Sequence, residues 1–88
     1  MITKGYTITS AQGMHARPAT QLVKLAKEFS ATISIKKGDK TVKMNSLLNI
    51  LLLSIKSGET VALIIDGADE VSAAVAIDIF FTDTLKHL

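Results

Sequence analysis

One short stretch of the 88-residue sequence combines side chains that could bind and transfer a phosphoryl group. It runs from Gly13 to Thr20, reads Gly-Met-His-Ala-Arg-Pro-Ala-Thr and contains the only proline of the chain. His15 can supply a neutral imidazole nitrogen near pH 7, which can attack phosphorus and later give the group up. Arg17, two residues on, carries a guanidinium that matches the oxygens of a phosphoryl group. The spacing therefore indicates an anion site suited to phosphate.

The residues after this stretch predict a helix that begins beside His15. Apolar side chains recur at the i, i+3, i+4, i+7 spacing of one helix face, at Ala19, Leu22, Val23 and Ala26. We expect the helix to run from about Ala16 to Phe29, with Pro18 in the first turn, where proline is tolerated. The amides of Ala16 and Arg17 and the positive end of the helix dipole would then lie beside the imidazole. On the residues alone, a capping histidine and a solvated arginine remain the alternative interpretation.

The segment 13–19 closely resembles the active-site motif of the HPr family, the histidine-containing phosphocarriers of the bacterial phosphotransferase system. The resemblance covers essentially the whole chain and includes the segments 45–48 (Asn-Ser-Leu-Leu) and 67–70 (Gly-Ala-Asp-Glu). It implies that Nδ1 of His15 accepts a phosphoryl group from an enzyme I-like donor and passes it to EIIA-type acceptor domains for sugar uptake. Arg17 would screen the charge of that group, and Ala16 and Pro18 would shape the site. Such a protein is a phosphoryl carrier, not a turnover enzyme, and needs no cofactor or metal.

The residues around Ser46 leave the branch of the phosphotransferase system open. Asn45 and Leu47 depart from the usual residues of sugar HPr, and this region resembles the nitrogen-related paralogue NPr at least as well. In HPr from low-GC Gram-positive bacteria a dedicated kinase phosphorylates the serine at this place, so a regulatory module acting through Ser46 is a further alternative. A serine kinase and a transcription regulator would then be additional partners. Serine is also a good residue to cap a helix start, which explains Ser46 without regulation.

A second predicted helix, from Asn45 or Ser46 to about Lys56 with Gly58 after its end, supplies a candidate docking surface. The segment 47–55 is apolar almost all round, whereas a short helix on a small domain buries one face. Some of its leucines should therefore face solvent or a partner. The predicted docking patch consists of Leu47, Leu48 and Leu51, rimmed by Thr20, Lys24 and Lys27, and the family's partner-binding patch maps onto these positions.

Apolar alternation and turn residues predict the remaining elements. Strands are expected at 2–9, 31–36, 41–44 and 60–66, with Gly38 and Asp39 at a tight hairpin turn. A last helix should begin at Asp69 or Glu70 and bury the stripe Ala74, Ile77, Phe81 and Leu85, while His87 falls in the terminal tail as a surface residue. The order β-α-β-β-α-β-α predicts a single α+β domain over residues 1–88. We expect an open-faced β-sandwich, a four-stranded antiparallel sheet with three helices on one face.

Composition argues against several classes of function. The chain has no cysteine for a disulfide or a thiolate zinc site, and its apolar runs are too short for membrane insertion. Residues 1–56 hold nine Lys/Arg and two Asp/Glu (net +7), and residues 57–88 hold one Lys and six Asp/Glu (net −5). The basic half favours acidic or phosphorylated partners. Aromatic residues make up only 5%, which argues against nucleic-acid binding, and we expect a cytoplasmic monomer.

Overall fold

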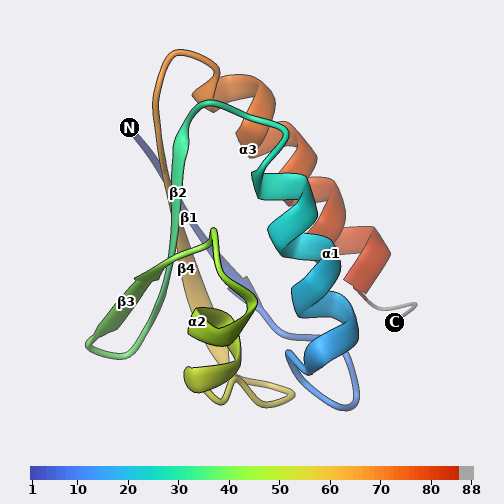
Figure 1. Cartoon of the computed structure of the whole chain (residues 1–88). Helices are drawn as coiled ribbons and strands as arrows, with labels where there is room; N and C mark the ends of the chain where they lie inside the picture. The colour runs from blue at the N-terminus through green and yellow to red at the C-terminus, as the bar shows by residue number, and fades with distance from the viewer. Residues whose placement is uncertain (86–88) are drawn as a thin grey trace.

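Four antiparallel strands form one sheet in the computed structural model, which describes residues 1–85. They are β1 (Ile2–Thr7), β2 (Thr32–Lys37), β3 (Lys40–Lys43) and β4 (Thr60–Asp66), in the spatial order β1-β4-β2-β3 (Figure 1). The central strands pair so that Ile33 lies opposite Ile65 and Ile35 opposite Leu63. β2 and β3 are joined by the two-residue turn that the sequence predicts. Apart from this hairpin, strands that neighbour each other in space are distant in sequence.

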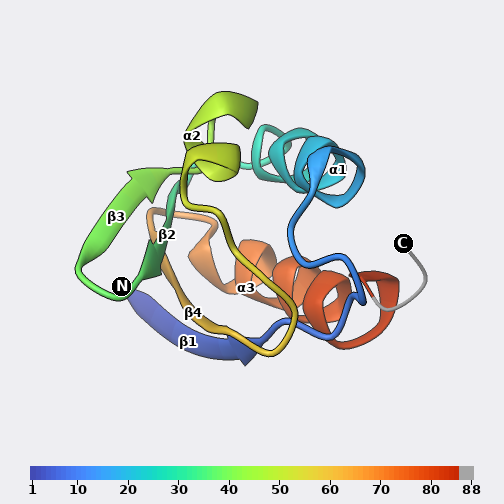
Figure 2. The same cartoon turned by 90° about the horizontal axis from the view of Figure 1, so that it is seen from below.

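Within residues 1–85, three α-helices cover one face of the sheet (Figure 2). They are α1 (Ala16–Ala26), α2 (Leu47–Leu52) and α3 (Glu70–Ile79), and α3 continues into a π-helical turn, η1 (Phe80–Thr84). The order of the elements and the one-sided sandwich confirm the predicted fold class. The prediction for His87 falls outside the described residues.

The core lies between the sheet and the helices. Ile35, Leu63 and Ile65 are fully buried on the inner face of the sheet, whereas Ala62 and Ile64 point to the outer face and are half-buried. The predicted stripe of the last helix is buried throughout, at Ala74, Ile77, Phe81 and Leu85. Each large apolar side chain removed from water stabilises the fold by about 1.5–3 kcal/mol. The strand and helix periodicities therefore identify the core faces correctly.

α1 ends earlier than its apolar pattern predicts, at Ala26 rather than Phe29. The amides of Glu28 and Phe29 bond to the carbonyls three residues back, those of Leu25 and Ala26, so the helix closes in a tighter turn. The chain then leaves for β2.

α2 also ends early, at Leu52 rather than near Lys56. Ser54 lies in the left-handed region at φ 52°, which stops the helix just beyond its last turn. The ammonium of Lys37 donates to the carbonyls of Leu53 (3.0 Å) and Ser54 (2.9 Å), which the helix leaves unpaired. The side chain of Lys37, from a strand that is distant in sequence, therefore holds the end of this helix.

The prediction that Gly58 directly follows α2 is wrong, because Gly58 lies in the turn before β4. Its amide donates to the carbonyl of Ile8, and the amide of Ile8 donates to the carbonyl of Glu59, each at 2.9 Å. These bonds follow the end of β1, which stops at Thr7 rather than Thr9.

Asp69, the residue before α3, fastens the turn between α1 and β2. Its carboxylate accepts hydrogen bonds from the amides of Ser30 and Ala31, each at 2.8 Å. These bonds, the one from Ser30 first, hold the pKa of Asp69 below its ordinary value. A carboxyl group with a lowered pKa stabilises the fold above the pKa of the unfolded chain, about 4, and loses that contribution as the pH falls through the folded-state value.

We therefore expect Asp69→Ala to lower the melting temperature at neutral pH and to have a smaller effect well below about pH 4, where the carboxylate is protonated in either state. Thermal unfolding followed by circular dichroism across the acid range measures the difference. Asp39→Ala, at an exposed position of the β2–β3 turn, is the control. An equal loss at neutral and acid pH would contradict the role given to the carboxylate.

Candidate functional site

His15 stands at the start of α1 with one of its ring nitrogens enclosed. It is the N-cap residue (φ −85°, ψ −172°), and its carbonyl accepts the first helical hydrogen bond, from the amide of Ala19 at 3.1 Å. Its half-buried side chain makes no capping hydrogen bond. Nε2 is buried without a hydrogen-bond partner in residues 1–85. Packing therefore encloses the Nε2 edge of the ring, which leaves Nδ1 as the candidate reactive nitrogen.

The first turn of α1 supplies the groups around the imidazole. Ala16 and Arg17 are exposed, and their amides precede the first amide that bonds within the helix. Pro18 offers no N–H, and its ring is fully buried, which fixes the turn against the core. Thr20 donates its hydroxyl to the carbonyl of Ala16 at 2.7 Å. The helix end thus presents two amides, a positive dipole and a guanidinium beside His15.

The loop before α1 is tied to the segment that follows α2. The amide of Met14, a buried residue, donates to the carbonyl of Ile55 at 2.9 Å. Gly13 has φ +70°, and a Cβ there would lie 2.8 Å from Cα of Lys56 and closer still to the Ile55 carbonyl oxygen. Only glycine allows this approach of two backbones. The contact places His15 one residue away from the chain that leaves α2.

Ser46 is the N-cap of α2. Its backbone is extended, and its Oγ accepts a hydrogen bond from the amide of Asn49 at 3.4 Å. The capping role expected from the residue type is confirmed. Regulatory phosphorylation of Ser46 stays a prediction.

The leucines of α2 divide into two pairs. Leu48 and Leu52, one turn apart, are 63% and 67% exposed, whereas Leu47 and Leu51 are half-buried and pack against the core. The expectation that some of these leucines face solvent is met by Leu48. The predicted docking patch omits Leu52, although its i, i+4 spacing from Leu48 is the signal that identifies it.

α2 lies beside α1 (Figures 1 and 2). Lys24 and Lys27 are exposed on α1.

The C-terminal end of α2 is held by Lys37, whose ammonium also lies 3.1 Å from the carboxylate of Glu59. A hydrogen bond from the amide of Lys56, and then one from Lys37, lower the pKa of Glu59. The exposed leucines therefore project from a helix that is fastened at both ends.

The described residues 1–85 contain no group of three or more His, Cys, Asp or Glu side chains that could hold a metal ion. In the same part of the chain, no helix has the length and apolar character needed to span a bilayer.

Residues 2–83 match the family model described as PTS HPr component phosphorylation site. The chain belongs to the HPr family. It is 34% identical over 83 residues to the phosphocarrier protein HPr of Lysinibacillus sphaericus, with 94% of each chain covered. It is 38% identical over 77 residues to the HPr of Mycoplasma capricolum, with 88% of this chain and 86% of that protein covered. The solved structure of a histidine-containing phosphocarrier protein from Mycoplasma has a TM-score of 0.91, 34% identity and 97% coverage of both chains.

This HPr is a phosphocarrier of the phosphotransferase system, as the family match and the named relatives agree. Its structure brings His15, Arg17 and the free amides together at one helix start and sets the exposed leucines on the neighbouring helix. Ser46 caps the N-terminal end of α2, whereas Lys37 binds the carbonyls at its C-terminal end. Among residues 1–85, Ser46 shares no hydrogen bond with the turn that contains His15. The sequence does not predict the contact of Gly13 with the chain after α2, because the residues next to Gly13 carry no signal for a contact with such a distant segment.

Proposed function

We propose that Nδ1 of His15 is the atom on which this HPr carries its phosphoryl group. The observation that carries the proposal is the enclosure of Nε2, which is buried and unpartnered and so cannot be reached by a phosphorylated donor. A phosphoryl group on Nδ1 would meet the exposed first turn of α1, where the amides of Ala16 and Arg17 can donate hydrogen bonds to its oxygens. The positive end of the helix would favour the same charge.

The transfer at His15 needs no general base. In the reactive neutral tautomer the proton is on Nε2, and the lone pair of Nδ1 attacks the phosphorus of the phosphorylated donor. The bond between phosphorus and the donor breaks as the N–P bond forms, and no proton leaves the attacking nitrogen. When an acceptor nucleophile attacks the same phosphorus, the N–P bond breaks and the electron pair returns to Nδ1. The imidazole ends each cycle unchanged, as a carrier requires.

Arg17 would screen the two negative charges of the phosphoryl group, and its substitution tests this role. We expect Arg17→Glu to slow phosphoryl transfer by roughly 10- to 100-fold, because it removes a charge-assisted hydrogen bond and adds a repelling charge. The side chain is exposed, so the melting temperature should change little. Arg17→Lys keeps the positive charge but not the planar guanidinium, so its transfer rate should fall less than that of Arg17→Glu. Unchanged transfer rates in both variants would remove Arg17 from the site.

The proposed partners are an enzyme I-like donor and EIIA-type acceptors of the sugar branch, each meeting the carrier as a monomer. They would dock on the exposed leucines of α2 beside the start of α1. The exposed ammonium groups of Lys24 and Lys27 would attract an acidic partner surface. Leu48 and Leu52 carry most of the exposed apolar area of this patch, which otherwise consists of Leu47, Leu51 and Thr20.

Leu48→Asp should weaken docking without unfolding the protein. Because Leu48 is 63% exposed, the free energy of unfolding should change by no more than about 0.5 kcal/mol. The KM of the donor enzyme for the variant should rise roughly tenfold, as expected when an apolar contact at an interface centre is lost. Leu47→Asp is the matched comparison, since Leu47 packs against the core and its substitution should also lower stability. A large fall in melting temperature for Leu48→Asp, or an unchanged KM, would contradict this assignment.

Reconstitution with phosphoenolpyruvate and purified donor enzymes tests the function as a whole. We expect sugar-type enzyme I to phosphorylate the protein and EIIA domains to discharge it. Phosphorylation by a nitrogen-type donor alone would replace the sugar branch with the NPr-like alternative, and phosphorylation by neither would contradict the proposal. The isolated phosphoprotein should release inorganic phosphate slowly, whereas rapid multiple turnover would identify an enzyme instead of a carrier.

A further inference from the structure

The chain that follows α2 carries the backbone on which the loop before α1 rests. The carbonyl of Ile55 accepts a hydrogen bond from the amide of Met14 at 2.9 Å, and the backbone of Ile55 and Lys56 closes the space beside Gly13. Met14 is buried and directly precedes His15. A shift of the Ile55 carbonyl would therefore move the residue next to His15 and, with it, the imidazole.

Ile55 lies in a connecting segment, residues 53–59, that belongs to neither α2 nor β4. Ser54, the residue before it, has φ 52° and is the only residue other than glycine with a positive φ within residues 1–85. Residues with a Cβ rarely adopt this conformation, because the Cβ then crowds the backbone. Contacts from outside the segment must therefore hold it in place.

Lys37 and Glu59 supply contacts on both sides of Ile55. The ammonium of Lys37 donates to the carbonyls of Leu53 at 3.0 Å and Ser54 at 2.9 Å. The carboxylate of Glu59 accepts a hydrogen bond from the amide of the residue after Ile55 at 2.6 Å. The two charged groups lie 3.1 Å apart, and their side chains are only 26% and 36% exposed, so salt screens the pair less than one in open solvent. The pair therefore brackets Ile55.

We propose that Lys37 and Glu59 are positioning residues for phosphoryl transfer, because they hold the Ile55 carbonyl that anchors the loop before α1. This role depends on the proposed function of His15 as the phosphoryl carrier. Among residues 1–85, neither side chain is hydrogen-bonded to the imidazole, so the pair acts through the backbone of Ile55 and Met14.

The pair should affect the rate of transfer more than the binding of partners. The bonds from Lys37 are made beyond the last residue of α2, whereas α2 itself is held by the Ser46 cap and the buried Ile50. A displacement of the reacting nitrogen by about 1 Å can slow a reaction by as much as roughly 100-fold. Loss of the pair should therefore slow transfer within the complex and leave docking unchanged.

Hydrogen exchange of the Met14 amide tests the structural part of the proposal. Lys37→Met keeps the aliphatic character of the side chain and removes the donors to both carbonyls. We expect this variant to accelerate exchange at Met14 at least about tenfold more than at Leu63, in the inner strand β4. Lys36→Met, at the exposed neighbouring position of β2, should change neither rate. Equal acceleration at Met14 and Leu63, or unchanged exchange at Met14, would overturn the proposal.

Single-turnover kinetics tests the functional part. With a phosphorylated donor enzyme and saturating carrier, Lys37→Met should accept phosphate roughly tenfold more slowly, and its half-saturating concentration should stay within about twofold. Lys37→Arg keeps N–H donors at the same place and should recover most of the rate. A raised half-saturating concentration with an unchanged rate, or no change in either quantity, would overturn the proposal.

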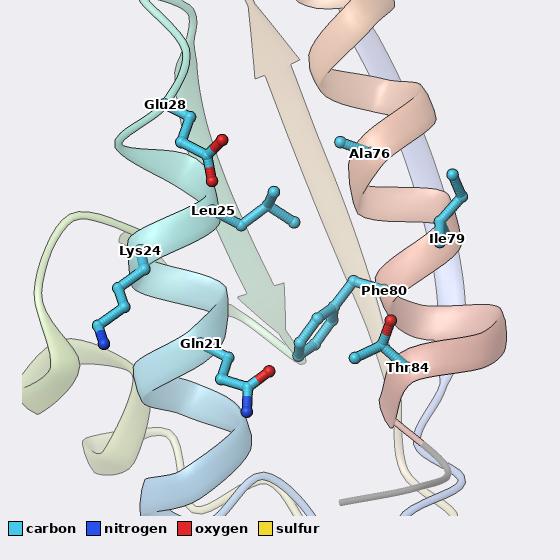
Figure 3. Close-up of a pocket in the computed structure, with 8 residues that line it drawn as sticks. All are labelled: Gln21, Lys24, Leu25, Glu28, Ala76, Ile79, Phe80 and Thr84. Atoms are coloured by element: carbon cyan, nitrogen blue, oxygen red, sulfur yellow. The ribbon is translucent and has the colours of Figure 1, made fainter.

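Glu59→Ala has a matched control in Glu28→Ala. Glu28 is exposed just beyond α1 and lines the groove between α1 and α3, which includes neither the loop before α1 nor residues 53–59 (Figure 3). Both variants lose one negative charge, so a transfer rate that falls only in Glu59→Ala assigns the effect to the contacts of Glu59. Equal rates in the two variants would overturn the proposal. Failure of the unaltered protein to accept phosphate on His15 would instead contradict the proposed function itself.

Discussion

His15→Ala is expected to abolish phosphorylation by enzyme I and phosphoenolpyruvate while leaving the protein folded. The substitution removes the nucleophilic nitrogen, and the exposed groups beside it, Ala16 and Arg17, offer no replacement that could hold a transferable phosphoryl group. The imidazole makes no capping hydrogen bond, and its Nε2 is buried without a partner. Its loss should therefore change the free energy of unfolding by no more than about 1 kcal/mol.

Phosphate incorporation measured by mass spectrometry, together with thermal unfolding, checks both parts of this expectation. His87→Ala removes the only other histidine of the chain and should be phosphorylated normally. Residual histidine-linked phosphate in His15→Ala would show that the carrier residue is misassigned. A loss of phosphorylation accompanied by unfolding would be resolved by His15→Gln, which keeps a polar side chain of similar size.

Gly13→Ala is expected to cause the largest loss of stability of any substitution near the site, about 2–4 kcal/mol. A non-glycine residue at φ +70° costs about 1–2 kcal/mol, and the new Cβ would overlap the backbone at Ile55 and Lys56, which cannot move aside as a flexible side chain could. For a chain of this length the melting temperature should fall by roughly 10–25 °C. The folded fraction should also accept phosphate more slowly, because the displaced loop carries His15.

Gly38→Ala is the matched control for that experiment. Gly38 has a similar positive φ of 62°, but nothing lies within 4 Å of the position its Cβ would take. Gly38→Ala should therefore lower the free energy of unfolding only by the conformational cost of a positive φ, about 1 kcal/mol. Equal losses at Gly13 and Gly38 would show that the contact between the loop and the chain after α2 contributes nothing.

Local residue types predict the elements of the site well. A single proline placed in a first turn and apolar residues at helical spacing locate the start of α1, so His15 is correctly predicted at a helix end. The excess of leucines in a short helix correctly predicts exposed apolar surface, and the two i, i+4 pairs divide as helix geometry requires. These predictions succeed because they depend on periods of a few residues.

Features set by distant contacts escape such reasoning. α2 ends where Lys37, on a strand that is distant in sequence, donates to the carbonyls of Leu53 and Ser54, although Gly58 is the residue type that locally predicts a helix end. The strand order and the enclosure of Nε2 both depend on how the helices and strands pack together in the folded protein.

NMR of the phosphorylated protein labelled with ¹⁵N in its histidine rings tests the central claim most directly. A phosphorus–nitrogen coupling identifies the ring atom that is bonded to phosphorus, and assignment of the ring identifies the residue. We predict that the coupling is seen at Nδ1 of His15. A coupling at Nε2 of that ring, or phosphate on any other residue of the chain, would contradict the account.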